Sequence, residues 1–274
     1  MSPVRTAAEV LEAIQKVKAS ATAFCTNFFP VQSKLENWVT RGEVTAEAHD
    51  GVTFFLRKDR DFSHLYFCAA NSAAFGRELA QLSSGTAEKL ATDLVGPEAS
   101  LTELLNLAQQ CGFRRYSRLV RLARVASAVS PSSVQCPAGI QVAAEGDAPE
   151  ILGLIELLFD RFADQLPTLY EIEAAIAARQ IFIIRQNGAI AALLFFETQG
   201  VTSTIRYWLV ASQFHSRGFG SALIRHYFLS QPAVRRFMLW VAATNQNAIQ
   251  KYQHYGYKPD GLVDYVLLSE PVKN

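Results

Sequence analysis

The sequence predicts an α/β protein built from two tandem units. Three observations support this prediction: the second half alternates β-rich runs with helical periodicity, the first half repeats that order more weakly, and an uncharged Pro/Ser-containing segment, Val125–Gly139, separates them. A chain of 274 residues is long enough for two ordinary domains. We therefore expect one domain over residues 1–127 and a second over residues 139–274.

The second half begins with a short strand and two helices. Ile140–Ala143 has the apolar character of a strand, and Gly146–Pro149 supplies a cap and an early proline for a helix. Apolar residues then recur at spacings of three and four, which predicts an amphipathic helix with these residues on one face: Ile151, Leu154, Ile155 and Leu158. We expect the next helix near Leu169–Arg179.

A hairpin and three further strands follow. Asn187-Gly188 joins two β-rich runs, and this pair tolerates the positive φ angles of a type I′ turn. The pattern then predicts, in order, a strand Thr204–Ser212, a helix from about Gly220, a strand Phe237–Ala243, a helix Asn247–Tyr255 and a strand Leu262–Leu268.

The first half gives a weaker version of the same order. The expected elements are a helix Ala7–Lys18, strands Val52–Arg57 and Phe62–Ala70, a helix Ala74–Leu82, a strand Leu90–Val95, a helix Leu101–Gln110 and a strand Tyr116–Leu122. Cys111-Gly112-Phe113 takes the place that Tyr255-Gly256-Tyr257 has in the second half. The match lies in element order and not in residue identity.

Composition narrows the range of functions. The net charge is +1, so no global field draws the protein to nucleic acid or to a membrane. Acidic Glu9 and Glu12 interrupt any signal peptide, and no apolar run is long enough to span a membrane. The four cysteines, Cys25, Cys68, Cys111 and Cys136, show neither zinc-site nor disulfide spacing. We expect a cytoplasmic protein without a metal site.

One stretch, Leu209–Ile224, has the pattern of an anion site. A strand leads into a loop containing Gly218 and Gly220, and a helix begins at once. Glycines allow close backbone approach, and the helix N-terminus directs unpaired N–H groups at a ligand, which suits a phosphate or pyrophosphate. Leu223 replaces the third glycine of a dinucleotide-binding fingerprint, and no Gly-Lys-Ser/Thr of a Walker loop follows.

A second motif follows one strand later. The loop reads H-S-R-G-F-G over His215–Gly220, and the later motif N-x-x-A-x-x-x-Y-x-x-x-G-Y fits Asn245, Ala248, Tyr252, Gly256 and Tyr257. Together these motifs resemble those of the GNAT superfamily of acyl-CoA N-acyltransferases, over about residues 139–270. The resemblance implies GNAT-like units in tandem, each a mixed, mostly antiparallel twisted sheet flanked by helices.

The resemblance also implies roles for individual residues. Acetyl-CoA, or another acyl-CoA, would be the co-substrate, with Val210 N–H polarising the thioester carbonyl and Tyr252 protonating the departing thiolate. The strand end would pair with the pantetheine arm, the loop amides would hold the pyrophosphate, and Asn245 would hydrogen-bond the coenzyme. The implied coenzyme-binding set is Leu209, Val210, His215, Ser216, Arg217, Gly218, Phe219, Gly220, Ser221 and Asn245.

Two positions depart from the family pattern. His215 stands where Arg or Gln is usual, and Trp240 stands where many members carry a glutamate base. Glu197 and a water chain are the alternatives for the base that deprotonates the acceptor amine. The first half has Asn71–Phe75 in place of a glycine loop, so it is expected to be a degenerate GNAT-like domain that completes the acceptor pocket or docks against the second half.

The expected activity is acetyl or acyl transfer to a primary amine of a small molecule or peptide, by direct attack through a tetrahedral intermediate. We expect a monomer or homodimer. A non-catalytic acyl-CoA-binding sensor or scaffold is the alternative that Trp240 prompts. An aminoacyl-tRNA-dependent transferase is a third, prompted by a basic cluster, although nucleic-acid binding is disfavoured because a closing strand would direct these side chains mostly to solvent: Arg114, Arg115, Arg118, Arg121 and Arg124.

Overall fold

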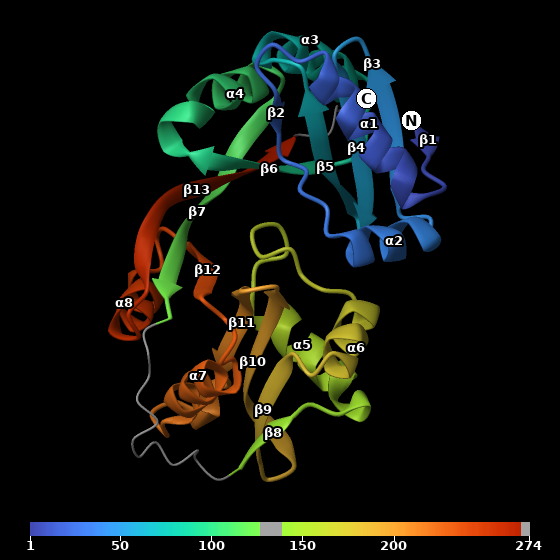
Figure 1. The fold of residues 1–274 in the computed structure, drawn as a ribbon. Coiled ribbons are helices and arrows are strands. Elements are labelled where there is room, and N and C mark those ends of the chain that lie inside the picture. Colours follow the sequence, from blue (N-terminus) through green and yellow to red (C-terminus); the bar gives the residue numbers. More distant parts are fainter. Residues whose placement is uncertain (127–138, 270–274) are drawn as a thin grey trace. The chain divides into compact units, whose positions relative to one another are not determined.

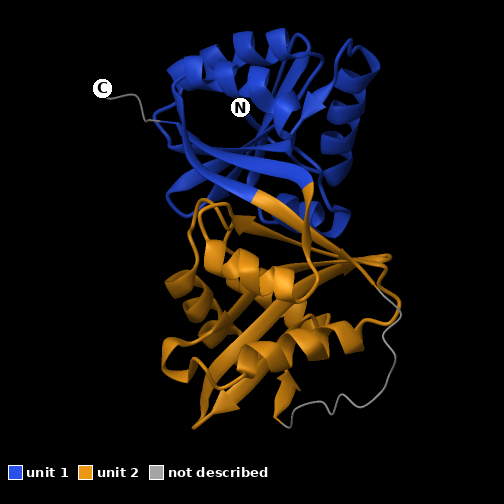
Figure 2. Cartoon of the chain, turned by 90° about the vertical axis from the view of Figure 1, so that its left-hand side faces the viewer, with its two compact units in different colours: residues 1–119, 261–274 blue, residues 120–260 orange. Residues whose placement is uncertain are grey.

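The computed structural model describes residues 1–126 and 139–269. Most of the predicted linker, with Cys136, lies outside these residues. The chain divides into two compact units, which Figure 2 colours separately. Unit 1 comprises residues 1–119 and 261–274, and unit 2 comprises residues 120–260.

Unit 1 is a sheet with helices on both faces. Its helices are α1 (Ala7–Ala19), α2 (Gln32–Thr40), α3 (Ser72–Gly85) and α4 (Glu98–Gln110). Thr6 and Asn71 accept hydrogen bonds from Glu9 N and Ala74 N, so side-chain caps start α1 and α3. The strands are β1 (Ser2–Pro3), β2 (Cys25–Thr26), β3 (Val44–His49), β4 (Val52–Asp59), β5 (Phe62–Ala69) and β6 (Leu90–Pro97).

Unit 2 repeats the element order of unit 1, except that its described residues have no strand between the first two α-helices (Figure 1). Its strands are β8 (Ile140–Val142), β9 (Ile181–Gln186), β10 (Ala189–Gln199), β11 (Thr202–Val210) and β12 (Arg236–Ala242). Its α-helices are α5 (Ala148–Leu158), α6 (Leu169–Ala177), α7 (Phe219–Ser230) and α8 (Gln246–His254). Helices α5 and α6 cover one face of the sheet, over a core that includes Ile151, Ile172 and Leu193. Helix α7 covers the other, over Leu194, Leu223 and Tyr227.

Each sheet is completed by a strand from the other half of the sequence. Beyond β6, unit 1 continues with β13 (Lys258–Ser269), which pairs antiparallel from Leu262↔Pro97 to Leu268↔Ala91. Beyond β12, unit 2 continues with the part of β7 (Phe113–Val125) from Val120 onward, and Ala126 N after its end donates to Arg235 O at 2.9 Å. The predicted boundaries 1–127 and 139–274 follow the order of the chain, whereas the compact units divide β7 at Leu119/Val120 and assign residues 261–274 to unit 1.

The predicted fold class is confirmed. The hairpin has φ of 52° at Asn187 and 84° at Gly188, the positive values expected of its turn. The sequence prediction omitted α2 and β3. The local signal of β3 is weak: it reads V-T-A-E-A-H, so its alternation rests mostly on alanines, and only Val44 is fully buried. Glu47, one of its four half-buried residues, lies opposite Phe54 of β4. Tertiary pairing, and not strand propensity, places this segment in the sheet.

Candidate functional site

Strands β11 and β12 are paired only over their N-terminal halves. Their parallel register extends from Thr202↔Arg236 to Ile205↔Leu239, although each strand continues for several residues. On its other side, β11 stays paired with β10 as far as Ala192↔Val210. Beyond Ile205, therefore, one edge of β11 has no strand partner in the described part of the chain.

A β-bulge lies where the two strands part. Phe195 pairs with Tyr207 and Phe196 with Ile205, so Arg206 is an extra residue in β11. The bulge resets the alternation of side chains. Ile205 and Trp208 pack into the core under α7, whereas Tyr207 packs into the core under α5 and α6.

The backbone groups of β11 divide between its two edges. Ala211 N donates to Ala191 O at 2.9 Å, so the alternation of an antiparallel ladder also directs Leu209 towards β10. Trp208 and Val210 then direct their N–H and C=O groups at the edge without a partner. His215 Nε2 donates to Val210 O at 2.9 Å, so this imidazole holds the loop against the strand end.

Helix α7 begins without a side-chain cap. Its cap residue is Gly218, with φ of 79°, and the first intrahelical bond runs from Ala222 N to Gly218 O at 2.9 Å. The N–H groups of Phe219, Gly220 and Ser221 therefore have no acceptor within the helix, and the helix dipole adds positive potential at this end. This is the arrangement that favours an anion.

Gly220 allows α7 to approach β11 closely. A Cβ atom at this position would lie 3.4 Å from both Trp208 Cζ2 and Val210 Cγ2. Ser216, two residues before the cap, has φ of 63°. The loop thus turns sharply enough to set the first amides of α7 beside the strand edge.

Tyr252 lies on α8 beside the same strand. Its ring centroid is 5.4 Å from that of Trp208 and 5.9 Å from that of Tyr257. Burial raises the pKa of Tyr252, and the Asp164 carboxylate raises it further, so the phenol stays protonated. Trp208 Nε1 is buried and has no hydrogen-bond partner among the described residues. An unsatisfied donor at this edge fits a polar ligand.

The later motif has a local structural reason as well. Asn245 caps α8, since its Oδ1 accepts from Ala248 N at 3.1 Å. Gly256 ends the helix with φ of 84°, and Tyr257 is buried. Tyr255 OH donates to Ser221 Oγ at 2.8 Å, which joins α8 to the first turn of α7.

Glu197, a candidate for the general base, and Trp240, which replaces the family's glutamate, lie on different strands. Glu197 is on β10 opposite Thr204, and its Oε1 is 4.0 Å from Arg206 Nε. Trp240 is on β12, with the Arg121 guanidinium 5.8 Å from its ring. Sequence reasoning missed Arg206 and Asp164. A bulge has no sequence signature here, so nothing marked Arg206 as lying at the parting of the strands.

The model of the Acetyltransferase (GNAT) family matches residues 150–257. This segment is a GNAT-family domain. It contains β11, the loop, α7, β12 and α8, so the family match covers the whole site described above. No curated protein matches the sequence significantly.

Solved structures share the GNAT fold. A GCN5-related N-acetyltransferase from Sphaerobacter thermophilus is 17% identical over 82% of this chain and 78% of that chain, with a TM-score of 0.61. One from Kribbella flavida is 16% identical over 86% and 93%, with a TM-score of 0.55. A tandem GNAT protein from the clavulanic acid biosynthesis pathway is 11% identical over 100% and 98%, with a TM-score of 0.64.

In unit 1, the parallel strands β5 and β6 also pair over only part of their length, as β11 and β12 do in the GNAT domain. In unit 1, however, another segment of the chain pairs with the free edge. β5 and β6 are parallel only at Ser63↔Leu90 and His64↔Ala91. Beyond this point β2 pairs with β5 at Cys25↔Ala69 and Thr26↔Cys68. The next residue, buried Asn27, donates to Leu65 O at 3.1 Å and Thr92 Oγ1 at 3.0 Å, and accepts from Phe67 N at 2.7 Å. The chain itself occupies this edge.

We expect Asn27→Ala to destabilise unit 1 by about 1–3 kcal/mol. The substitution leaves the buried Phe67 N–H without its acceptor, and one unsatisfied buried group costs about 1–3 kcal/mol, whereas Leu65 O keeps its hydrogen bond from Thr92 Oγ1. Urea unfolding followed by fluorescence measures this loss. A loss below about 0.5 kcal/mol would contradict a role for Asn27 in holding the strands.

The basic cluster is engaged in local contacts. Arg118 forms two bonds with Glu98, Arg121 Nε is 2.8 Å from Asp260 Oδ2, and the Arg115 and Arg124 guanidiniums lie over the rings of Tyr265 and Phe228. These four arginines therefore have partners within the protein, and their presence does not require a nucleic-acid ligand.

Other site types receive no support from the described residues. They contain no group of His, Cys, Asp and Glu side chains suited to a metal. Their cysteines, Cys25, Cys68 and Cys111, are free thiols. None of their helices is both long and apolar enough to cross a membrane.

Proposed function

We propose that the GNAT domain is an acyl-CoA-dependent N-acyltransferase, with acetyl transfer from acetyl-CoA to a primary amine as the first reaction to test. The observation that carries this proposal is the edge of β11 that loses β12 just before an uncapped helix N-terminus. A coenzyme with an extended amide-containing arm and a pyrophosphate matches these two features in order.

The coenzyme would follow this path. Its pyrophosphate would accept hydrogen bonds from the backbone amides of Arg217–Ser221, where no large basic excess is needed. Its pantetheine amides would pair with Trp208 and Val210 as an added strand does. Leu209 would support the same stretch by holding β11 to β10. Asn245, with its Oδ1 in the helix cap, has its side-chain N–H groups for the coenzyme.

Two groups would act on the thioester. The Val210 N–H polarises the carbonyl as negative charge develops on its oxygen. Tyr252 donates a proton to the departing thiolate, and its raised pKa keeps that proton in place until the thiolate forms. The acceptor, a small-molecule or peptide amine, approaches from the face of the sheet that carries α5 and α6, because Tyr252 and α7 occupy the coenzyme face.

The direct test is thiol release from acetyl-CoA with a panel of primary amines, combined with calorimetric titration of coenzyme A. Amine-dependent thiol release with binding supports the transferase. Binding without release by any amine supports the sensor or scaffold that Trp240 prompts. Failure to bind coenzyme A at all overturns both.

Coenzyme A should bind at one site per chain. The edge of β5 that corresponds to the proposed coenzyme edge is occupied by Cys25, Thr26 and Asn27, so unit 1 has no backbone left to offer there. Calorimetric titration of the full chain measures the stoichiometry. Two equivalent sites per chain would show that the Cys25–Asn27 segment does not close this edge.

A further inference from the structure

The proposed reaction leaves one proton without a recipient. The acceptor is an ammonium at neutral pH and must lose a proton before its nitrogen attacks. Trp240 stands where the family often has a glutamate, and Glu197 is held beside the Arg206 guanidinium. A further carboxylate of unit 2, Asp164, lies in the loop between α5 and α6.

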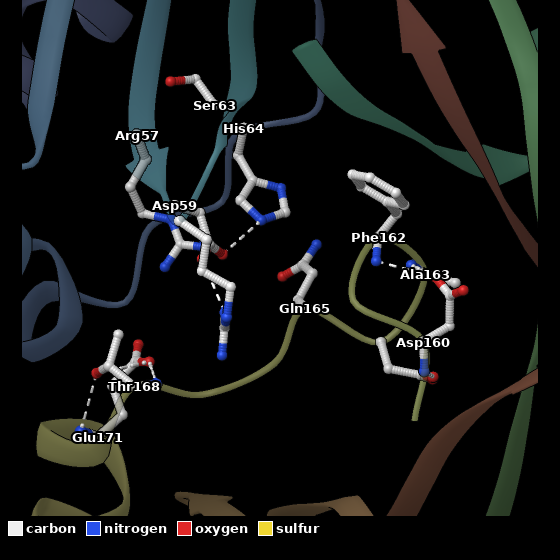
Figure 3. Close-up of polar contacts among 12 residues, drawn as sticks. Arg57, Asp59, Ser63, His64, Asp160, Phe162, Ala163, Gln165, Thr168 and Glu171 are labelled. Atoms are coloured by element: carbon white, nitrogen blue, oxygen red, sulfur yellow. Dashed lines mark hydrogen bonds and ion pairs between the residues drawn. The ribbon is translucent and has the colours of Figure 1, made fainter. Parts of the chain in front are cut away.

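That loop is an ordered structure. Asp160 Oδ1 accepts from Phe162 N and Ala163 N, both at 2.9 Å, and Figure 3 shows these three residues folded together. Asp164 N donates to Asp160 O at 2.9 Å, and Asp160 N donates to Asp164 Oδ2 at 2.8 Å. These reciprocal bonds fix the backbone and the carboxylate of Asp164.

The loop is also attached to the bulge. Tyr207 OH lies 3.0 Å from both Asp164 O and Gln165 O, and its proton is shared between the two carbonyls. Tyr207 is the residue after the bulged Arg206, where β11 leaves β12. Asp164 is thus held at the parting of the strands, on the face that carries α5 and α6.

The Asp164 carboxylate and the Tyr252 phenol interact electrostatically. The Asp164 carboxylate raises the pKa of Tyr252, which lies on the α7 face beside Trp208. Burial raises the pKa of Asp164 itself, while the Arg206 guanidinium opposes that rise. A carboxylate with a raised pKa is a better proton acceptor than one exposed to water.

We propose that Asp164 is the general base that takes the proton from the acceptor ammonium. This inference rests on the proposed transferase function. One N–H bond of the ammonium breaks and the proton moves to the Asp164 carboxylate. The nitrogen lone pair then forms the C–N bond, the C–S bond breaks, and the thiolate takes the proton of Tyr252. Solvent removes the proton from Asp164 and restores that of Tyr252.

The surroundings make the site suitable for a cation. The titratable groups that interact with the Asp164 carboxylate come from its own loop, β11 and α8: Asp160, Arg206, Tyr207 and Tyr252. The Arg206 guanidinium also interacts with the carboxylates of Glu197 and Glu171. The one cation beside Asp164 in this set therefore has other carboxylates to balance it, which leaves Asp164 suited to an acceptor ammonium.

The test compares Asp164→Asn, Asp164→Glu and the control Glu173→Gln, which neutralises an exposed carboxylate of α6, in thiol release with the best amine of the panel. We expect Asp164→Asn to lower kcat/KM by about 10²–10⁴-fold, with unchanged coenzyme A affinity. Its rate should rise with pH up to the pKa of the amine, because only amine already neutral in solution can react. Asp164→Glu should recover part of the rate, and Glu173→Gln should retain it within a few-fold.

The outcomes separate the two proposals. Absence of amine-dependent thiol release by the wild-type protein overturns the transferase and the base together. Release by the wild type with an unchanged rate and pH profile in Asp164→Asn overturns the base alone. Equal loss of rate and of coenzyme A binding in that variant would also overturn it, because Asp164 would then only hold the loop.

Discussion

Tyr252→Phe is expected to lower kcat by about 10²–10⁴-fold and to leave coenzyme A affinity unchanged. The phenol is the proposed donor to the departing thiolate, while the ring alone makes the contacts with Trp208 and Tyr257. Removal of the hydroxyl therefore deletes the proton and keeps the packing. Steady-state thiol release and calorimetric titration measure the two quantities separately.

Tyr255→Phe is the matched control for this change. Tyr255 follows α8 immediately, and its hydroxyl bonds to Ser221 Oγ, so the control removes one hydroxyl from the same region without touching the proposed donor. We expect only a few-fold change in kcat. A Tyr252→Phe variant as active as the control would remove the catalytic role of Tyr252.

Gly218→Asp is expected to weaken coenzyme A binding by at least about tenfold, or about 1.4 kcal/mol. The residue caps α7 with φ of 79°, directly before the amides that would hold the pyrophosphate. An aspartate there strains the left-handed backbone and sets a negative charge at an anion site. Titration calorimetry gives the affinity, and thermal unfolding shows the cost to stability.

Gly188→Asp controls for the strain. Gly188 has φ of 84° in the hairpin turn, and a Cβ at either glycine meets nothing within 4 Å. The two substitutions therefore share backbone strain and added charge, but only Gly218 is the N-cap of α7. Equal coenzyme A affinity in the two variants would be inconsistent with the loop as the pyrophosphate site.

Local sequence signals predicted most of the fold. Turn chemistry at Asn187-Gly188 and the spacing of apolar residues in α5 are encoded within a few residues, so they were readable. The assignment of β13 to unit 1 and of the second part of β7 to unit 2 could not be predicted. Neither segment carries a local pattern that names its partner strand, so the sheet that it joins is decided by tertiary pairing.

The candidate site was readable to the same degree. The glycines of the loop and the Asn245–Tyr257 motif mark positions along the chain, and the structure places them around one end of β11. Asp164 and Arg206 carried no signal, because their position depends on a bulge and on a loop bonded to Tyr207. A segment such as Cys25–Asn27 also gives no warning that it fills a strand edge.

The most direct test of the central claim is a crystal structure of the full chain with coenzyme A. We expect the pyrophosphate on the amides of Arg217–Ser221, and the pantetheine arm along the edge of β11 at Trp208 and Val210. A coenzyme bound along β5 of unit 1, or one that leaves the β11 edge unoccupied, would contradict it.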